Sequence, residues 1–177
     1  MYALTYERLT DTAKPPNKPK SETCAGYDIH ADRVLGRNGK MFDSPMEMSK
    51  ALTVAPGERV LVGTGLAMRF DVDATNSVGE VQIRPRSGNA WKHGVTVLNA
   101  PGTIDYEYEG EICVIIINHG SEVITIAHGD AIAQAVPSSV PIGDDLACEG
   151  VVVGALLSNM RGADGFGSSG TVGGDDE

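Results

Sequence analysis

Three consecutive residues after a proline combine groups that bind phosphate oxygens. The segment 85–88 reads P-R-S-G, so a guanidinium (Arg86), a hydroxyl (Ser87) and a glycine amide (Gly88) follow one another. Guanidinium N–H groups bind phosphate in pairs, and backbone N–H groups add further hydrogen bonds. An ordinary charged turn has the same composition, so the segment gains weight as a phosphate site only beside other motifs.

A second candidate segment, residues 99–110, reads N-A-P-G-T-I-D-Y-E-Y-E-G. It carries an amide (Asn99), a carboxylate directly after an isoleucine (Asp105) and an aromatic ring three residues later (Tyr108). Its proline–glycine pair predicts a type II turn at 100–103 that joins two strands as a hairpin. A lone aspartate there can simply cap the turn, but its neighbours are not those of a plain surface turn.

Two further segments carry polar groups in unusual settings. Gln134 places a side-chain amide in the otherwise apolar segment G-D-A-I-A-Q (129–134). Residues 161–170 read R-G-A-D-G-F-G-S-S-G, and so many glycines make a segment costly to order, which predicts a mobile tail. A plain linker rarely contains an arginine, a phenylalanine and two serines at this spacing. The tail is therefore predicted to be a phosphate-binding lid with one aromatic ring.

The elements that position these segments are predicted to be strands. No stretch longer than about ten residues shows the 3.6-residue period of an amphipathic helix. Strands are predicted at 1–9, 25–31, 52–70 (a pair, with a turn at Pro56–Gly57), 78–84, 110–118, 122–126 and 131–136. Residues 36–50 show neither period and are predicted to form a surface insertion. Short strands between Gly and Pro turns favour an all-β sandwich, barrel or jelly roll.

Composition excludes several classes of protein. The chain has 177 residues, 41% of them hydrophobic, which is typical of one globular domain. Its formal net charge of −10 would repel DNA or RNA, so no nucleic-acid partner is expected. The longest aliphatic run, 114–117, is far shorter than the roughly 20 residues that span a bilayer. With three cysteines, no C-x-x-C spacing and no signal peptide, a cytoplasmic protein with reduced thiols is expected.

Taken in chain order, these segments resemble the five motifs of the trimeric dUTP pyrophosphatases (dUTPases). The matching segments are A-G-Y-D (25–28), P-R-S-G (85–88), N-A-P-G-T-I-D-Y-E-Y-E-G-E (99–111), G-D-A-I-A-Q (129–134) and R-G-A-D-G-F-G-S-S-G (161–170). The resemblance implies a jelly-roll fold, a distorted β-barrel of the β-clip type. It also implies Mg²⁺-dependent hydrolysis of dUTP to dUMP and pyrophosphate in a homotrimer with shared active sites. The β domain would span 1–160, and a mobile arm would span 161–177.

The resemblance also implies roles for individual residues. Asp105 stands where the family's general base activates the water that attacks the α-phosphorus of dUTP. Asp28 resembles the carboxylate that holds waters of a Mg²⁺ ion chelated by the triphosphate. Tyr108 would lie against the deoxyribose and leave no room for a 2′-hydroxyl. Contacts with the uracil edge are implied for four residues: Asn99, Gly102, Thr103 and Ile104.

The remaining implied contacts fall into two groups. Outside the tail, four residues match phosphate contacts: Arg86, Ser87, Gly88 and Gln134. In the tail, five residues match substrate contacts: Arg161, Phe166, Gly167, Ser168 and Ser169. Within the tail group, the phenyl ring would stack on uracil, and the arginine and the two serines would hold the γ-phosphate.

Two residues depart from the family's pattern, and two other functions stay open. Ala131 stands where arginine is common, so the charge that the family has at that position is absent. Asp164 stands where glycine is common and adds a negative charge near the expected phosphate site, so weaker substrate affinity or a solvent-facing Asp164 is expected. One alternative is a dCTP deaminase of the same fold, although that family's catalytic glutamate motif is not visible here. The other is a non-catalytic jelly-roll structural or regulatory protein, which would bind no nucleotide.

Overall fold

Two antiparallel sheets form the body of the protein in a computed structural model that describes residues 2–48, 51–73 and 76–142. The elements are β1 (Ala3–Arg8), β2 (Tyr27–His30), β3 (Arg33–Arg37), β4 (Lys40–Glu47), β5 (Leu52–Val54), β6 (Arg59–Gly63), β7 (Leu66–Asp71), β8 (Ser77–Arg84), α1 (Ser87–His93), β9 (Val95–Val97), β10 (Gly102–Asp105), β11 (Cys113–Asn118), β12 (Ile124–Ile126) and β13 (Ala131–Pro141). The all-β prediction is confirmed.

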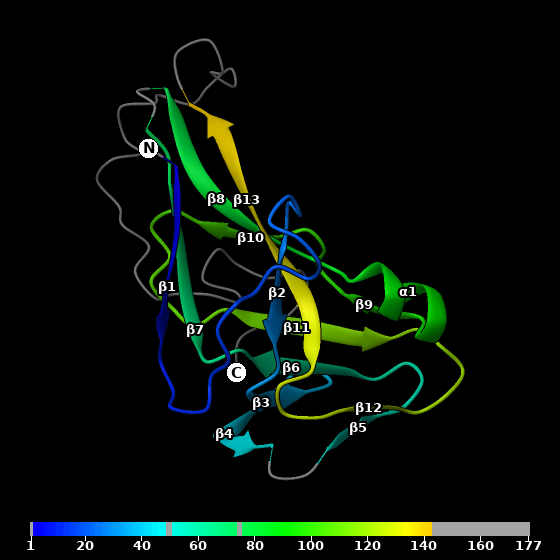
Figure 1. The fold of residues 1–177 in the computed structure, drawn as a ribbon. Helices are drawn as coiled ribbons and strands as arrows, with labels where there is room; N and C mark the ends of the chain where they lie inside the picture. Colours follow the sequence, from blue (N-terminus) through cyan, green and yellow to red (C-terminus); the bar gives the residue numbers. More distant parts are fainter. Residues whose placement is uncertain (1, 49–50, 74–75, 143–177) are drawn as a thin grey trace, which may run out of the picture.

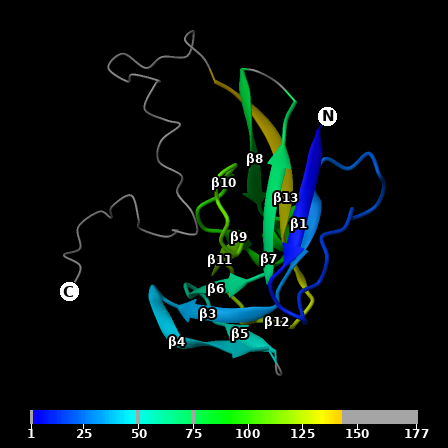
Figure 2. The same cartoon turned by 90° about the vertical axis from the view of Figure 1, so that its left-hand side faces the viewer.

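The sheets differ in the number and in the direction of their strands. One has the order β10-β8-β13-β2, and the other has the order β4-β3-β6-β11-β9. Two ribbons, β1-β7 and β12-β5, complete the fold. The long strands β8 and β13 run steeply through the view of Figure 1, and the five-stranded sheet lies across their lower end, as Figure 2 also shows.

Alternation along the central strands builds a single core. On β8 the side chains of Val81 and Ile83 are buried, and on β6 those of Val60 and Val62 are buried. All four belong to one hydrophobic cluster that includes residues of both sheets. Side chains alternate between the two faces of a strand. The polar residues Glu80, Gln82 and Arg84 of β8 therefore face away from this core. That outer face of the four-stranded sheet carries several of the predicted site residues.

The turn predicted at 100–103 is wrong. The Ala100 N–H donates to the Val97 carbonyl at 3.2 Å, so the chain reverses at 97–100, and the Ala100–Pro101 peptide bond is cis. Gly102 begins β10, where it pairs with Ile83 of β8. At the similar pair Pro56–Gly57 the prediction is confirmed: Gly57 has a φ of 80° within the turn.

The predicted hairpin is also corrected. Strand β9 pairs with β11, with Val97 opposite Ile116, but it does not pair with β10. Strand β10 instead joins β8 in the other sheet. The segment 98–101 therefore carries the chain from one sheet to the other, because each strand finds its partner far away in the sequence.

Residues 36–50, where no strand was predicted, contain β4. This strand pairs with β3 at the edge of the five-stranded sheet, and nearly all its side chains are exposed. An edge strand with both faces in water needs no apolar alternation, and it tolerates Pro45 because one side of its backbone is unpaired. The segment lies on the surface as predicted. The two strands predicted at 52–70 are three, because the second is divided at Thr64–Gly65 into β6 and β7, and β5 pairs with β12 instead of β6.

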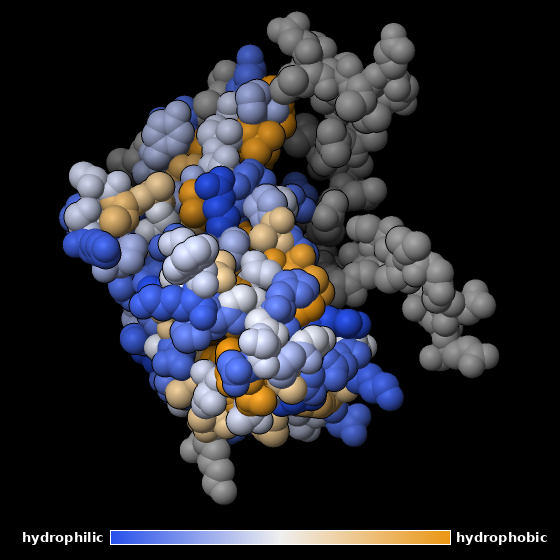
Figure 3. Space-filling view, turned by 90° about the vertical axis from the view of Figure 1, so that its right-hand side faces the viewer, coloured by the Kyte–Doolittle hydropathy of each residue, from blue (hydrophilic) through white to orange (hydrophobic). Residues whose placement is uncertain are grey.

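Helix α1 follows β8 after Pro85, where the sequence indicated a loop or a short helical start. It ends at Gly94, whose φ of 66° is the left-handed conformation that glycine adopts most easily, and the Gly94 N–H donates to the Ala90 carbonyl. Polar side chains dominate the face on which α1 lies, and hydrophobic ones appear in separate patches (Figure 3). No helix in the described ranges has the length and hydrophobicity that crossing a bilayer requires.

Candidate active site

The predicted site residues of three strands share the outer face of the four-stranded sheet. Gln134 of β13 pairs with Asp28 of β2 on one side and with Arg84 of β8 on the other. Asp105 of β10 pairs with Glu80 of β8. Side chains of directly paired residues point to the same face, so all five face away from the core.

At one end of this face Asp28, Arg86 and Gln134 form a hydrogen-bonded cluster. Arg86 donates from Nε to Asp28 Oδ1 and from Nη2 to Oδ2, both at 3.1 Å. The Gln134 amide donates to Asp28 Oδ1 at 3.2 Å. The Asp28 side chain is 7% exposed, so this bidentate pair compensates a nearly buried charge. The structure therefore brings together the predicted metal-associated residue and two predicted phosphate contacts.

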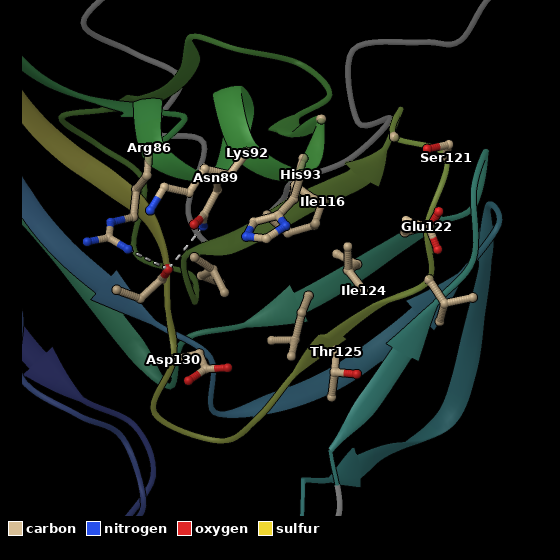
Figure 4. Close-up of a pocket in the computed structure, with 17 residues that line it drawn as sticks. Arg86, Asn89, Lys92, His93, Ile116, Ser121, Glu122, Ile124, Thr125 and Asp130 are labelled. Carbon is tan, nitrogen blue, oxygen red and sulfur yellow. Dashed lines mark hydrogen bonds between the residues drawn. The ribbon is translucent and has the colours of Figure 1, made fainter.

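Arg86 is fixed by a third bond that the sequence analysis did not identify. Its Nη1 donates to the carbonyl of Ala131 at 3.3 Å, and the Asn89 amide donates to the same oxygen at 3.5 Å (Figure 4). At position 131, where the family commonly has arginine, this chain contributes a backbone acceptor. No side-chain signal could have predicted it, because any residue type supplies a carbonyl.

The first turn of α1 presents the other predicted phosphate contacts. Ser87 and Gly88 are exposed, and no side chain of the part of the chain that the structure describes caps the start of the helix. Backbone N–H groups in a first turn have no partner within the helix, so they can donate to an anion. A Cβ on Gly88 would meet nothing within 4 Å, which leaves open space above this turn.

The segment around β10 holds the residues predicted to bind uracil. A Cβ on Gly102 would lie 3.3 Å from Asn99 Nδ2, so the amide packs directly over this glycine. Thr103 is exposed, and Ile104 is half-buried against the core. Asp105 is half-buried at the end of the same strand. The four predicted uracil contacts therefore lie beside the predicted general base.

Tyr108 is tied to both ends of its own loop. Its N–H donates to the Asp105 carbonyl at 3.0 Å, and its hydroxyl donates to the Glu111 carbonyl at 3.0 Å. Burial raises the pKa of Tyr108, so the phenol stays protonated and acts as a donor at neutral pH. The ring and the predicted general base are thus positioned as one unit.

The structure does not bring Asp105 close to the Arg86 cluster of the same chain. Their partners on β8 are Glu80 and Arg84, and four residues of strand span about 13 Å. Three strand spacings between β10 and β2 add about 14 Å across the sheet, so Asp105 and Asp28 lie about 19 Å apart. A general base must lie within hydrogen-bond reach of the water that it activates, so the two groups of one chain cannot serve one phosphate.

His30 is a polar residue of this region that the sequence analysis missed. It follows Asp28 by two residues on β2, is 4% exposed, and its Nδ1 is buried without a hydrogen-bond partner among the described residues. Burial lowers the pKa of His30, and the positive charge of Lys14 adds to this effect. The Asp28 carboxylate opposes it, and Arg86 lowers the pKa further. The alternation of side chains along a strand was the available signal, because it places His30 on the face of Asp28.

A metal ion would find few ligands here. Among the described residues no group of three His, Cys, Asp or Glu side chains is arranged to hold one. The Asp28 carboxylate has about four acceptor positions, and Arg86 and Gln134 use three of them. The described residues leave one position on Oδ2 open, which suits a single water of a Mg²⁺ ion whose other ligands come from elsewhere.

A cavity of about 610 Å³ lies between α1 and the segment that contains β12 (Figure 4). Arg86 and Asn89 line one end, and His93 and Ile124 line its middle. Neither Asp105 nor any other residue of 99–110 lines it. The cavity therefore adjoins the phosphate cluster but does not contain a complete predicted site. The tail residues Arg161, Phe166, Gly167, Ser168 and Ser169, and also Asp164, lie outside the described residues.

Comparison with known proteins gives consistent results. A family model described as dUTPase matches residues 45–170. The deoxyuridine 5'-triphosphate nucleotidohydrolase of an Anaeromyxobacter species is 42% identical over 169 residues, which cover 94% of this chain and 97% of the relative. That of Nautilia profundicola is 42% identical over 94% of this chain and 98% of the relative. That of Wolinella succinogenes is 50% identical over 68% of this chain and 74% of the relative.

Solved structures show the same fold. The dUTPase of Staphylococcus bacteriophage 80alpha aligns with a TM-score of 0.59 at 20% identity, over 85% of this chain and 98% of that one. The dUTPase of Streptococcus mutans aligns with a TM-score of 0.51 at 22% identity, over 78% and 95% of the two chains. The fold is thus the β-clip jelly roll, and with the matches over most of its length, the chain belongs to the dUTPase family.

Proposed function

We propose that this chain hydrolyses dUTP to dUMP and pyrophosphate in the cytoplasm. Relatives that are 42% identical over 94% of the chain are named for this substrate, and a phage 80alpha dUTPase has been solved with dUpNHpp. The observation that carries the proposal is the cluster of Asp28, Arg86 and Gln134, because it turns a flexible arginine into an oriented phosphate ligand.

Within the cluster, Arg86 keeps N–H donors that no described residue uses. A guanidinium has five N–H groups, and among the described residues Asp28 takes two and Ala131 takes one. The remaining two can donate to phosphate oxygens as a pair, beside the N–H groups of Ser87 and Gly88. Because protein bonds already hold the guanidinium, little side-chain entropy is lost when the triphosphate binds.

Asp105 is proposed as the general base and Tyr108 as the wall against the deoxyribose. Asp105 would accept a proton from water as the water oxygen attacks the α-phosphorus, and the bond to the bridging oxygen would break to release pyrophosphate. Asn99, with the backbone of Gly102, Thr103 and Ile104, would pair with the uracil edge. Cytosine would leave these polar groups unpaired, which selects strongly for uracil.

Each site is proposed to be completed by other copies in a homotrimer. The separation of about 19 Å between Asp105 and Asp28 within one chain supports this, since one triphosphate needs both the base and the phosphate cluster. Asp105 of one copy would then act on a triphosphate held by Arg86 of the next. The tail residues Arg161 and Phe166 are proposed to close over that site from a further copy.

Mg²⁺ is proposed to enter as part of the substrate, chelated by the triphosphate. Mg²⁺ prefers substrate phosphates and water to an all-protein cage, which fits the single acceptor position left on Asp28. The dUTPase of phage phi11 of Staphylococcus aureus coordinates a structural Mg(II) ion. In this chain the carboxylate would orient one metal-bound water.

A pyrophosphate-release assay tests the proposal. The purified chain with Mg²⁺ should release pyrophosphate from dUTP and much less from UTP, dCTP or dTTP, and chelation of Mg²⁺ should stop the reaction. Light scattering on the same sample should give the mass of three chains. Ammonia release from dCTP would indicate a deaminase instead, and no turnover of any nucleotide would refute the assignment.

A further inference from the structure

Glu111, the last residue of the segment 99–111, has a carboxylate that accepts hydrogen bonds on both oxygens. Oε2 accepts from Arg33 Nη2 of β3 at 2.7 Å, and Oε1 accepts from the backbone N–H of Gly65 at 2.6 Å. The side chains of Arg33 and Glu111 are 18% and 13% exposed, so water screens the pair weakly. The ion pair thus joins strand β3 and the β6–β7 turn to the end of the loop that carries Tyr108.

The backbone next to this carboxylate is anchored to the same turn. Ile112 donates from its N–H to the Leu66 carbonyl at 2.7 Å, and its own carbonyl accepts from the Thr64 hydroxyl at 2.8 Å. The Glu111 carbonyl, in between, accepts the Tyr108 hydroxyl at 3.0 Å. The position of the phenol therefore depends on where the backbone of Glu111 is held.

Gly110 also restricts the space around the Tyr108 phenol. A Cβ on Gly110 would lie 2.5 Å from the Tyr108 hydroxyl oxygen and 2.6 Å from Cζ, so the ring packs directly on this glycine. To reject a 2′-hydroxyl by shape, the Tyr108 ring must stay in place when a ribose, which is larger than deoxyribose, enters the site. Rejection of one extra hydroxyl by a loose apolar wall is weak.

We propose that the Arg33–Glu111 ion pair is a specificity determinant that acts through Tyr108, holding the ring rigid so that UTP is excluded. The inference rests on the proposed function and goes one step beyond it. Arg33 and Glu111 are assigned the role of positioning residues, which act through Tyr108. Without the pair, Glu111 would shift toward solvent, the phenol would lose its fixed acceptor, and the ring would give way to a 2′-hydroxyl.

The chain offers a matched control pair on the same strand. Arg37, four residues after Arg33 on β3, donates to Glu58 at 2.8 Å, and Glu58 likewise accepts a backbone N–H, that of Ala55, at 2.8 Å. This pair lies at the Pro56–Gly57 turn, and among the described residues it hydrogen-bonds to Thr53 and Ala55, far in sequence from Tyr108. If both ion pairs only stabilise the fold, loss of either one should therefore have the same effect on substrate selectivity.

The test compares kcat/KM for dUTP with kcat/KM for UTP in Arg33→Met and in Arg37→Met. In Arg33→Met the ratio should fall on the order of tenfold, since small displacements of positioning groups cost rates of this size or more. In Arg37→Met it should stay within about twofold of wild type. Partial unfolding lowers both rates together and leaves the ratio unchanged, so a structural role alone would not move it.

Further variants keep the proposal open to refutation. Arg33→Lys should recover part of the ratio, because it keeps the charge but not the planar fork. Should Arg33→Met fail to fold, Glu111→Gln removes the charge of the same ion pair from its other side and should lower the ratio as well. If the wild type discriminates against UTP and the Arg33 and Arg37 variants keep the same ratio of kcat/KM for dUTP to kcat/KM for UTP, the inference is refuted and the proposed function is not. A wild type without dUTP turnover overturns the proposed function instead.

Discussion

Replacement of Asp28 by asparagine should destabilise the protein, because an amide cannot reproduce the bonds of the carboxylate. Oδ1 accepts from Arg86 and from Gln134, and Oδ2 accepts from Arg86. An asparagine NH₂ group at the Oδ2 position loses one charge-assisted bond, and at the Oδ1 position it loses two. It also turns its own donors toward the donors of Arg86.

The expected decrease in the free energy of unfolding follows from the smaller of these losses, that of one hydrogen bond. One hydrogen bond between charged groups contributes about 1.5 to 3 kcal/mol. The Arg86 side chain is 32% exposed, so water recovers part of the loss, and we expect Asp28→Asn to lower the free energy of unfolding by about 2 kcal/mol. In a chain of this length that corresponds to a melting temperature lower by about 4 to 8 °C.

Urea unfolding followed by circular dichroism measures this difference, with all variants at one protomer concentration because assembly adds to apparent stability. Asp71→Asn is the control: its pair with Arg69 spans 3.2 Å, and the two side chains are 42% and 52% exposed. That variant removes the same charge but should cost less than about 0.5 kcal/mol. An Asp28→Asn midpoint equal to that of Asp71→Asn would refute the role of the cluster.

Three other outcomes are expected. Asp105→Asn should abolish pyrophosphate release while the dissociation constant for dUTP stays within about tenfold, since the amide keeps the shape but not the base; equal losses of binding and turnover would contradict that role. Burial lowers the pKa of His30 below the value of about 6.5 that an exposed imidazole has, so the protein's stability falls as the pH drops from about 6.5 through the folded-state pKa of His30. His30→Gln should flatten the fall of the urea midpoint between pH 7 and pH 5, and the exposed control His119→Gln should not. Truncation after Met160 should slow turnover but keep the trimer on light scattering; dissociation would assign the tail to assembly instead.

The sequence was most informative where function depends on local residue order. The motif at 85–88 predicted an arginine, a hydroxyl and a glycine amide in one place, and the structure has them at the β8–α1 junction. The turn at Pro56–Gly57 is confirmed because its hydrogen bond, from Glu58 to Ala55 at 3.0 Å, closes within four residues. The family and the all-β class were predicted for the same reason, since motif order and strand alternation are properties of the chain itself.

Tertiary structure decided what joins distant segments. The turn predicted at 100–103 failed because Gly102 pairs with β8, a strand that no local rule could designate as its partner. The bonds from Asp28 to Arg86 and to Gln134 span 58 and 106 residues of sequence. Strand register and strand order are both set by which apolar faces pack together, and the two together fix the distance between Asp105 and that cluster. The sequence therefore determined which groups are present for chemistry, and the packing of the sheets determined that one chain cannot bring them all to one phosphate.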